Sequence, residues 1–187
     1  MSTLMNKQEM FEILPLWGQA LAAARMARRG ILALVGSIPS ENLAAALAAC
    51  DELERCARDG QGWHARHTVF DKGLSALRQR DSVFVLHALR WAIGAAAAAE
   101  GAWDFPVDGT VTISARRAIE GLGNDPRVGT LQTAILLGAD ADLIAFACDE
   151  VGIGQYDALT AQVFGRLTPV HPVILSEPLI SRKYDYR

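Results

Sequence analysis

Residues 83–100, VFVLHALRWAIGAAAAAE, are the stretch of sequence that decides the fold. The segment is long enough for several helical turns and is apolar on nearly every side. His87, Arg90 and Gly94 fall at helical spacing and form one narrow stripe without large apolar side chains. A helix of this kind lies inside a bundle rather than on its surface. The sequence therefore predicts an all-α fold, either a multi-helix bundle or a short two-layer helical stack, around this central helix.

Length and composition place the chain among ordinary globular proteins. At 187 residues it is long enough for one substantial core, so a single domain is expected. Hydrophobic residues make up 51% of the chain and charged residues 21%, a balance typical of soluble proteins. The net charge of −3 at pH 7 argues against a broad basic surface, and so against nucleic acid as the main partner.

Helical spacing of apolar residues continues over most of the chain, with short turns rich in Gly, Asp and Pro. We therefore expect one helical domain over residues 1–167 with mostly antiparallel neighbours. Asp125 followed by proline predicts a helix that begins at Pro126, and Asp140 predicts the N-cap of another. Residues 110–114 alternate apolar and polar side chains, which predicts either a very short strand or the start of a helix. Further helices are expected at 15–29, 41–58, 115–122, 126–137, 141–151 and 156–167.

The C-terminal residues 168–187 differ in kind from the rest of the chain. Pro169, Pro172 and Pro178 disfavour helix and favour an extended chain. The apolar run VILSEPLI is too hydrophobic for a free tail. We expect an extended arm that lies either on the protein's own surface or on a partner, including a second copy of the chain in a homodimer.

The sequence favours a soluble, cytoplasmic protein without a membrane span. The N-terminus lacks the apolar segment of a signal peptide. The best candidate spans are 83–99, which contains His87 and Arg90, and 131–148, which Asp140 and Asp142 interrupt. The chain has three cysteines, an odd number, and a reducing cytoplasm does not sustain disulfides. We interpret the cysteines as small buried apolar residues.

Two thiols and two imidazoles, which are zinc ligand types, occur close together as Cys50, Cys56, His64 and His67. Their spacing is unlike that of a zinc knuckle, because five residues separate the cysteines on an expected helix. Side chains six positions apart on a helix point in different directions. We therefore expect no metal and no cofactor, with the cysteines in the core and the histidines on a loop.

His87 and Arg90 are the candidates for a small-molecule site. They share one helix face, and an anionic ligand between helices could use both, with Trp91 and Trp103 as aromatic walls. The alternative is that both side chains meet carboxylates on neighbouring helices or reach solvent. The glycine-rich residues 121–126 complete no phosphate-binding pattern, and the chain contains no recognised catalytic signature. We therefore lean away from an enzyme.

Acidic residues and the C-terminal arm are the candidates for a protein-binding surface. Asp142, Asp149 and Glu150 lie around one expected helix, where the first stabilises a helix N-terminus and the others form a solvated acidic face. The arm adds Pro172, Ile174 and Leu175. The sequence thus favours a non-catalytic protein–protein interaction module, such as an immunity protein that neutralises a toxic effector or an adaptor. The alternative is a small-molecule-binding protein or enzyme with an inter-helix pocket at His87 and Arg90.

Overall fold

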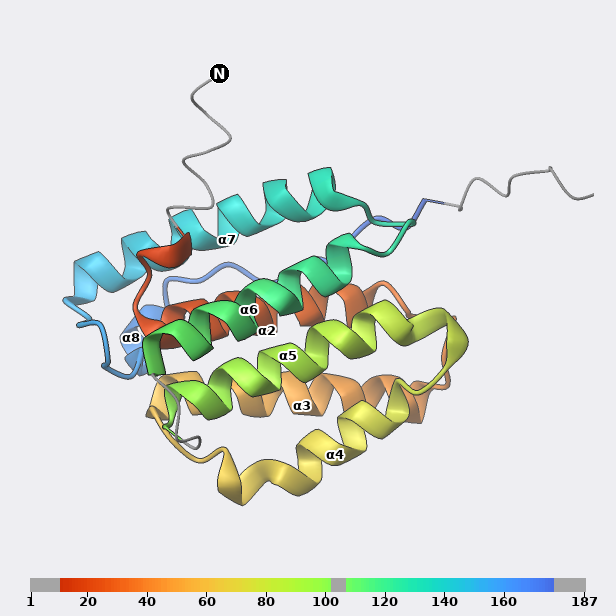
Figure 1. Cartoon of the computed structure of the whole chain (residues 1–187), viewed down its shortest axis with the longest axis horizontal. Coiled ribbons are helices and arrows are strands. Elements are labelled where there is room, and N and C mark those ends of the chain that lie inside the picture. Colours follow the sequence, from red (N-terminus) through yellow and green to blue (C-terminus); the bar gives the residue numbers. More distant parts are fainter. Residues whose placement is uncertain (1–10, 102–106, 177–187) are drawn as a thin grey trace, which may run out of the picture.

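The computed structural model describes residues 11–101 and 107–176, which fold into a bundle of α-helices (Figure 1). The described residues contain no strand, so the prediction of an all-α fold is confirmed. Two single-turn 3-10 helices precede α4 and α5. The helices are α2 (Leu16–Leu32), α3 (Ser40–Asp59), α4 (His67–Ala76), α5 (Val83–Ala99), α6 (Val107–Gly123), α7 (Thr130–Val151) and α8 (Thr160–Phe164).

Helix α2 runs through the middle of the bundle. It packs against α3, α5, α6 and α7, whereas α4 packs mainly on the outside of α3 (Figure 1). Every residue of α2 is buried except Arg28 and Leu32. Many of these residues are alanine or glycine, and Gly30 lies against the side chains of Leu122 and Val85. Small side chains on α2 let neighbouring helices approach closely, as expected for an interior helix.

Helix α5, the segment from which the fold was predicted, lies beside α2 and packs chiefly against α6 and α2. Its second half, residues 92–98, is completely buried. His87 and Arg90 are exposed, whereas Gly94, the third residue of the stripe, is buried. The bundle therefore contains two alanine-rich interior helices, and α2 is the more enclosed of them.

Three helices, α6, α7 and α8, differ most from the sequence prediction. Residues 110–114 belong to α6, because Val111, Ala115, Ala118 and Leu122 bury one continuous helical face. The strand alternative is therefore wrong. The final helix is only the five residues of α8 rather than 156–167.

The third difference concerns α7, a single helix of 22 residues. It begins at Thr130 rather than Pro126, because Asp125 accepts hydrogen bonds from the backbone and guanidinium of Arg127 and holds the chain in a turn. Asp140 lies inside this helix and is buried, so its prediction as an N-cap is wrong.

The described part of the C-terminal arm, residues 168–176, is extended and lies on the bundle. The backbone N–H of Val173 donates to the carbonyl of Arg29, and that of Ser176 donates to the carbonyl of Arg127. Ile174 exchanges two hydrogen bonds with the side chain of Gln132 on α7. Residues 168–176 therefore pack on the same chain, and the rest of the expected arm lies outside the described residues.

Two helical stretches of the described chain are long and apolar enough to cross a membrane by length and composition alone, Arg80–Ala99 and Thr130–Val151. The internal charges noted in the sequence do not prevent this. The most apolar part of the first stretch is 61% buried within the bundle and that of the second is 39% buried. The first is thus a core helix, whereas α7 has an apolar side that the bundle does not cover.

Candidate functional site

Helix α7 presents three large apolar side chains to the outside. Leu131, Ile135 and Phe146 are 68%, 55% and 60% exposed. At about 100° per residue they fall within an arc of about 60°. The opposite side of the helix packs on the core through Ile144, Ala147 and neighbouring residues. We call the exposed arc the α7 outer face, made of Leu131, Ile135, Asp142, Phe146 and Asp149.

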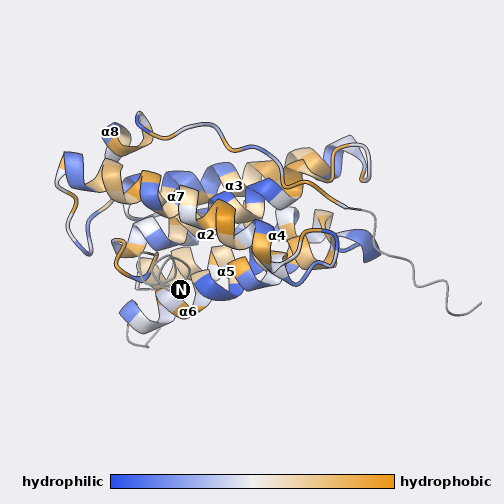
Figure 2. Ribbon diagram, turned by 90° about the horizontal axis from the view of Figure 1, so that it is seen from above, coloured by the Kyte–Doolittle hydropathy of each residue, from blue (hydrophilic) through white to orange (hydrophobic). Residues whose placement is uncertain are grey.

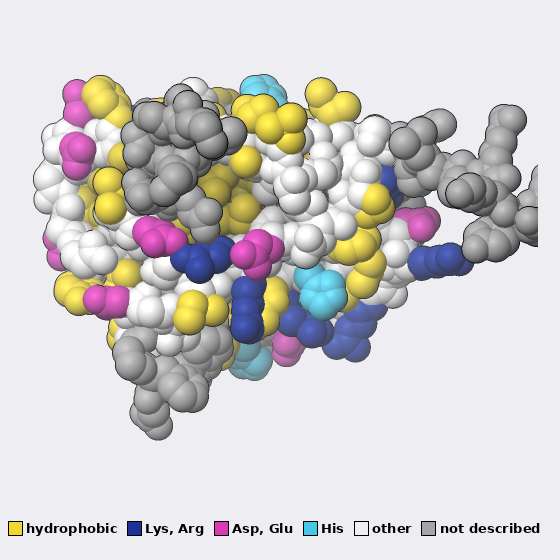
Figure 3. Space-filling model, turned by 45° about the horizontal axis from the view of Figure 1, so that its top comes forward, with side chains coloured by type: hydrophobic (Ala, Val, Ile, Leu, Met, Phe, Trp, Pro, Cys, Tyr) yellow, Lys and Arg dark blue, Asp and Glu magenta, His cyan; other side chains and the backbone are white. Residues whose placement is uncertain are grey.

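Figure 2 views the molecule from the side on which α7 lies, and the helix has both hydrophobic and hydrophilic turns. Figure 3 shows part of this side with its side chains, where hydrophobic groups are open to view among acidic ones. Figure 3 also shows Lys and Arg side chains on this side. Helix α7 contributes none of them, because its own sequence contains no Lys or Arg. Several large apolar side chains exposed on one face of a helix are typical of an interaction site.

The acidic residues of the α7 outer face are available to a partner. Asp142 and Asp149 are exposed and form no ion pair with any other described residue. Glu150, at the edge of the face, accepts a hydrogen bond from Arg166 at 2.9 Å, and both side chains are exposed. A pair this exposed contributes little to stability, so Glu150 can exchange Arg166 for another cation at small cost.

The C-terminal arm extends the α7 outer face at one end. Ile174 is 79% exposed and is fixed beside Gln132, whose Oε1 lies 2.7 Å from the backbone nitrogen of Ile174. Pro172 is also exposed, whereas Leu175 packs against the core. The structure thus brings the predicted residue Ile174 next to α7, which carries the predicted acidic residues. It places Leu175 on the inner side of the arm.

Sequence reasoning missed the apolar half of this surface. Leu131 and Ile135 share one helix face in the sequence, but so do the buried residues of α7, and periodicity cannot distinguish an inner apolar face from an outer one. One feature of the sequence could have indicated the exposed apolar face: α7 is apolar on both sides. Its only charged residues are acidic, namely Asp140, Asp142, Asp149 and Glu150.

A buried ionic cluster joins α2, α7 and the arm. Arg25 Nε and Arg29 Nη2 each lie 2.9 Å from Oδ1 of Asp140, and all three side chains are almost completely buried. Arg25 also donates to the carbonyl of Thr168, and Arg29 to the carbonyl of His171. The two arginines thus fix the arm against α2.

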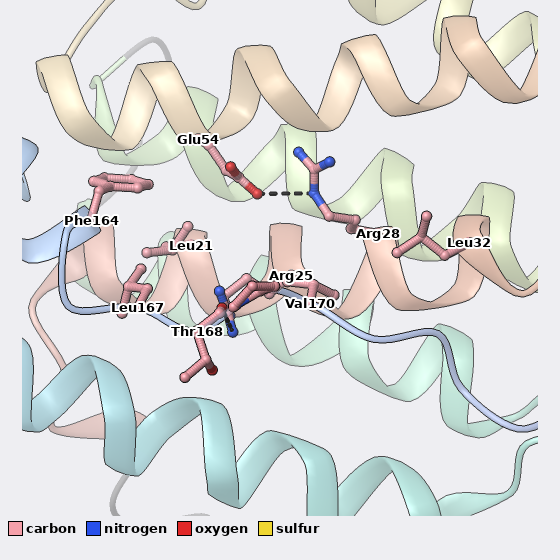
Figure 4. Close-up of a pocket in the computed structure, with 10 residues that line it drawn as sticks. Leu21, Arg25, Arg28, Leu32, Glu54, Phe164, Leu167, Thr168 and Val170 are labelled. Atoms are coloured by element: carbon pink, nitrogen blue, oxygen red, sulfur yellow. Dashed lines mark hydrogen bonds and ion pairs between the residues drawn. The ribbon is translucent and has the colours of Figure 1, made fainter.

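A cavity of about 360 Å³ lies beneath the arm, between α2, α3 and α8 (Figure 4). Arg28 closes one side, with its guanidinium 3.0 Å from Glu54 and 2.6 Å from Asp51. Burial raises the pKa of Glu54, while the nearby charge of Arg28 opposes this shift. Arg25 lines the other side. Apolar side chains line the rest of the cavity, namely Leu21, Leu32, Phe164, Leu167, Pro169 and Val170.

The predicted small-molecule site is only partly assembled. His87 and Trp91 line a second cavity, of about 340 Å³, between α5 and α6. The Arg117 guanidinium carbon lies 4.5 Å from the centre of a Trp91 ring, a cation–π contact that limits access to this aromatic face. Arg90 is exposed and does not line the cavity. Trp103 lies outside the described residues.

The cysteines and histidines considered for zinc do not converge. Cys50 and Cys56 are buried in the core, whereas His64 and His67 are exposed. Within residues 11–101 and 107–176, no three His, Cys, Asp or Glu side chains are placed to hold a metal ion. Burial raises the pKa of Cys50 to about 12 and the pKa of Cys56 and Cys148 to about 11.

These pKa values predict slow reaction of the native thiols with a disulfide reagent. At pH 8 a thiol with a pKa near 11 is ionised to roughly one part in a thousand, and the thiolate is the reactive form. We expect Ellman's reagent to label the folded protein slowly and to label three thiols per chain at once in denaturant. Rapid labelling of one thiol in the folded protein would show that its surroundings open.

The chain matches no protein-family model, no curated protein sequence and no solved structure. A functional conclusion therefore depends on the geometry and charge of these surfaces and cavities.

Proposed function

We propose that the protein is a non-catalytic protein–protein interaction module that binds another protein through the α7 outer face. The observation that carries this proposal is the exposure of Leu131, Ile135 and Phe146 in one arc of a helix whose other side is packed on the core. Exposed aromatic and aliphatic side chains gathered in this way are the usual anchors of a protein interface.

The charge of α7 favours a protein over a membrane surface. Helices that lie on membranes carry Lys and Arg on their polar side, which attract anionic lipids. Helix α7 has only acidic charges, and Asp142 and Asp149 lie within the exposed arc itself. A suitable partner therefore presents an apolar ridge flanked by basic residues, as an amphipathic helix does.

An immunity protein that neutralises a basic toxic effector and an adaptor in an assembly system are the two kinds of module that we propose. The acidic α7 outer face suits both. The three cysteines, buried and without disulfides, support the proposed cytoplasmic location. The alternative, a ligand pocket that uses His87 and Arg90, has weaker support because only His87 lines the cavity between α5 and α6.

The change Phe146→Glu tests the proposal. Tagged protein at native expression level would be captured from its own cells, and co-purifying proteins identified by mass spectrometry. We expect wild type to retain one stoichiometric partner and Phe146→Glu to bind it about 30-fold more weakly or worse, because an aromatic anchor contributes about 2 kcal/mol or more.

Val83→Glu is the matched control, since Val83 is also an exposed apolar residue but lies at the start of α5, away from α7. This variant should bind the partner as wild type does. Undiminished binding by Phe146→Glu would place the interface elsewhere. Recovery of the tagged protein without any partner would contradict the binding-module proposal. If untagged copies of the same chain are recovered together with the tagged protein, the partner is the chain itself.

A further inference from the structure

Arg25 has an unused hydrogen-bond donor at the wall of the cavity beneath the arm. The Arg25 side chain is buried, with the whole residue 3% exposed. Its Nε donates to Asp140 and its Nη2 to the carbonyl of Thr168, but Nη1 donates to no described residue. Arg29 differs, since all three of its guanidinium nitrogens donate. This donor is not enclosed by protein, since the buried side-chain nitrogens without a partner among the described residues are Trp63 Nε1 and Arg116 Nε. The cavity beside Nη1 therefore leaves room for an acceptor.

The charges around this donor favour an anion as that acceptor. Arg25 and Arg29 share the single carboxylate of Asp140. The charged residues that line the cavity itself are Arg25, Arg28 and Glu54, so its lining carries one excess positive charge. Arg28 already has two carboxylate partners, Glu54 and Asp51, so it needs no further anion. Glu54 takes its hydrogen bond from Arg28 at 3.0 Å, and the structure gives it none from Arg25.

The other lining residues restrict the size and charge of a ligand. The volume of about 360 Å³ lies at the lower end of the range for small-molecule sites. The two ends of the cavity are apolar, with Leu32 at the end beyond Arg28 and Leu21 and Phe164 toward the opposite end (Figure 4). A dianion would be repelled by Glu54 across the cavity, so a single negative charge fits best.

We propose that this cavity binds a small monocarboxylate with a compact apolar body, its carboxylate accepting from Nη1 of Arg25 and its body lying against the apolar side chains that line the cavity. A carboxylate on a buried guanidinium makes a charge-assisted hydrogen bond, which is stronger than a neutral one. The site is separate from the α7 outer face, so it stands or falls independently of the proposed protein partner.

Titration calorimetry of the purified full chain tests this site with octanoate and 3-phenylpropanoate as probes and octan-1-ol as the uncharged match. We expect saturable binding of at least one carboxylate. The alcohol should bind at least about tenfold more weakly, because it cannot make the charged contact with the buried guanidinium. Equal affinity for octanoate and octan-1-ol would overturn the role of Arg25. The absence of binding by both carboxylates up to their solubility would overturn the site.

Val170→Trp locates the binding. Val170 lines the cavity from the arm, so the larger side chain fills the space and should weaken carboxylate binding about tenfold or more. Ile174→Trp is the control on the same arm, because Ile174 is exposed and lies outside the cavity. Leu32→Trp fills the same space from α2 and serves if Val170→Trp does not fold. Binding that survives a folded cavity-filling variant at wild-type strength would place the ligand elsewhere and overturn the proposal.

Discussion

Replacing Asp140 by alanine is expected to lower the free energy of unfolding by about 3–5 kcal/mol, because it leaves two buried guanidinium groups without their shared carboxylate. Arg25 and Arg29 both contact Oδ1 of Asp140 at 2.9 Å, and these side chains are at most 8% exposed. Urea unfolding followed by circular dichroism measures the change. The arm should also become easier to cleave by protease, since both arginines hold it through the carbonyls of Thr168 and His171.

Asp142→Ala is the matched control for this prediction. Asp142 lies two residues further along α7 but is exposed and forms no ion pair with the other described residues. Its replacement should change the free energy of unfolding by about 0.5 kcal/mol or less. Similar losses for the two variants would mean that the cluster around Asp140 is no more important for stability than the surface of α7.

Gly73→Ala is expected to lower the free energy of unfolding by about 1–3 kcal/mol, because the new methyl group has no space. A Cβ atom at Gly73 would lie 2.6 Å from Cβ of Ala49 and 3.2 Å from the carbonyl oxygen of Ala45, where α4 crosses α3. The second neighbour is backbone, so α4 itself must shift. Urea unfolding again provides the measurement.

Gly109→Ala is the matched control, and it is expected to raise rather than lower the free energy of unfolding. Gly109 is also inside a helix, α6, but it is exposed, and a Cβ atom there would meet nothing within 4 Å. Alanine favours helix over glycine by about 0.5–1 kcal/mol, so this variant should gain about that much stability. If both variants change stability in the same direction, the close approach of α3 and α4 is not what requires glycine at position 73.

The fold class could be predicted because α5 is apolar on nearly every side over 17 residues. Such a segment needs neighbours all around it, and the helical spacing elsewhere supplies them. The position of α2 at the centre was harder to predict. Five of its buried residues are alanine, which is only weakly apolar, and it contains three arginines, a residue type that is rarely buried.

The course of α7 could not be predicted because its decisive contact is remote in sequence. Asp140 before an apolar run has the appearance of a helix N-cap, a local signal. Its real partners are Arg25 and Arg29, which are 115 and 111 residues away. Ion pairs with two buried arginines offset the cost of burying an aspartate in the middle of a helix. The sequence near Asp140 does not indicate that these arginines are its partners.

The acidic residues of the candidate surface could be predicted from the sequence, whereas its apolar residues could not. Asp142, Asp149 and Glu150 could be assigned to one helix because acidic residues on α7 are conspicuous among apolar ones. Leu131 and Phe146 could not be recognised as exposed, because only the packing of the bundle decides which apolar side of α7 faces outward. Local periodicity defines faces but does not assign them to core or solvent.

The order of synthesis has a consequence for the cluster that joins α2 to the arm. Arg25 leaves the ribosome 115 residues before Asp140 and 143 residues before Thr168. At a synthesis rate of about 5–20 residues per second, the growing chain waits roughly 6 to 29 s with α2 lacking these partners. During that interval the alanine-rich helix, destined for the centre, carries unneutralised arginines that keep it hydrated. We therefore expect the same positive charges that later hold the finished bundle together to make the nascent chain less prone to aggregate.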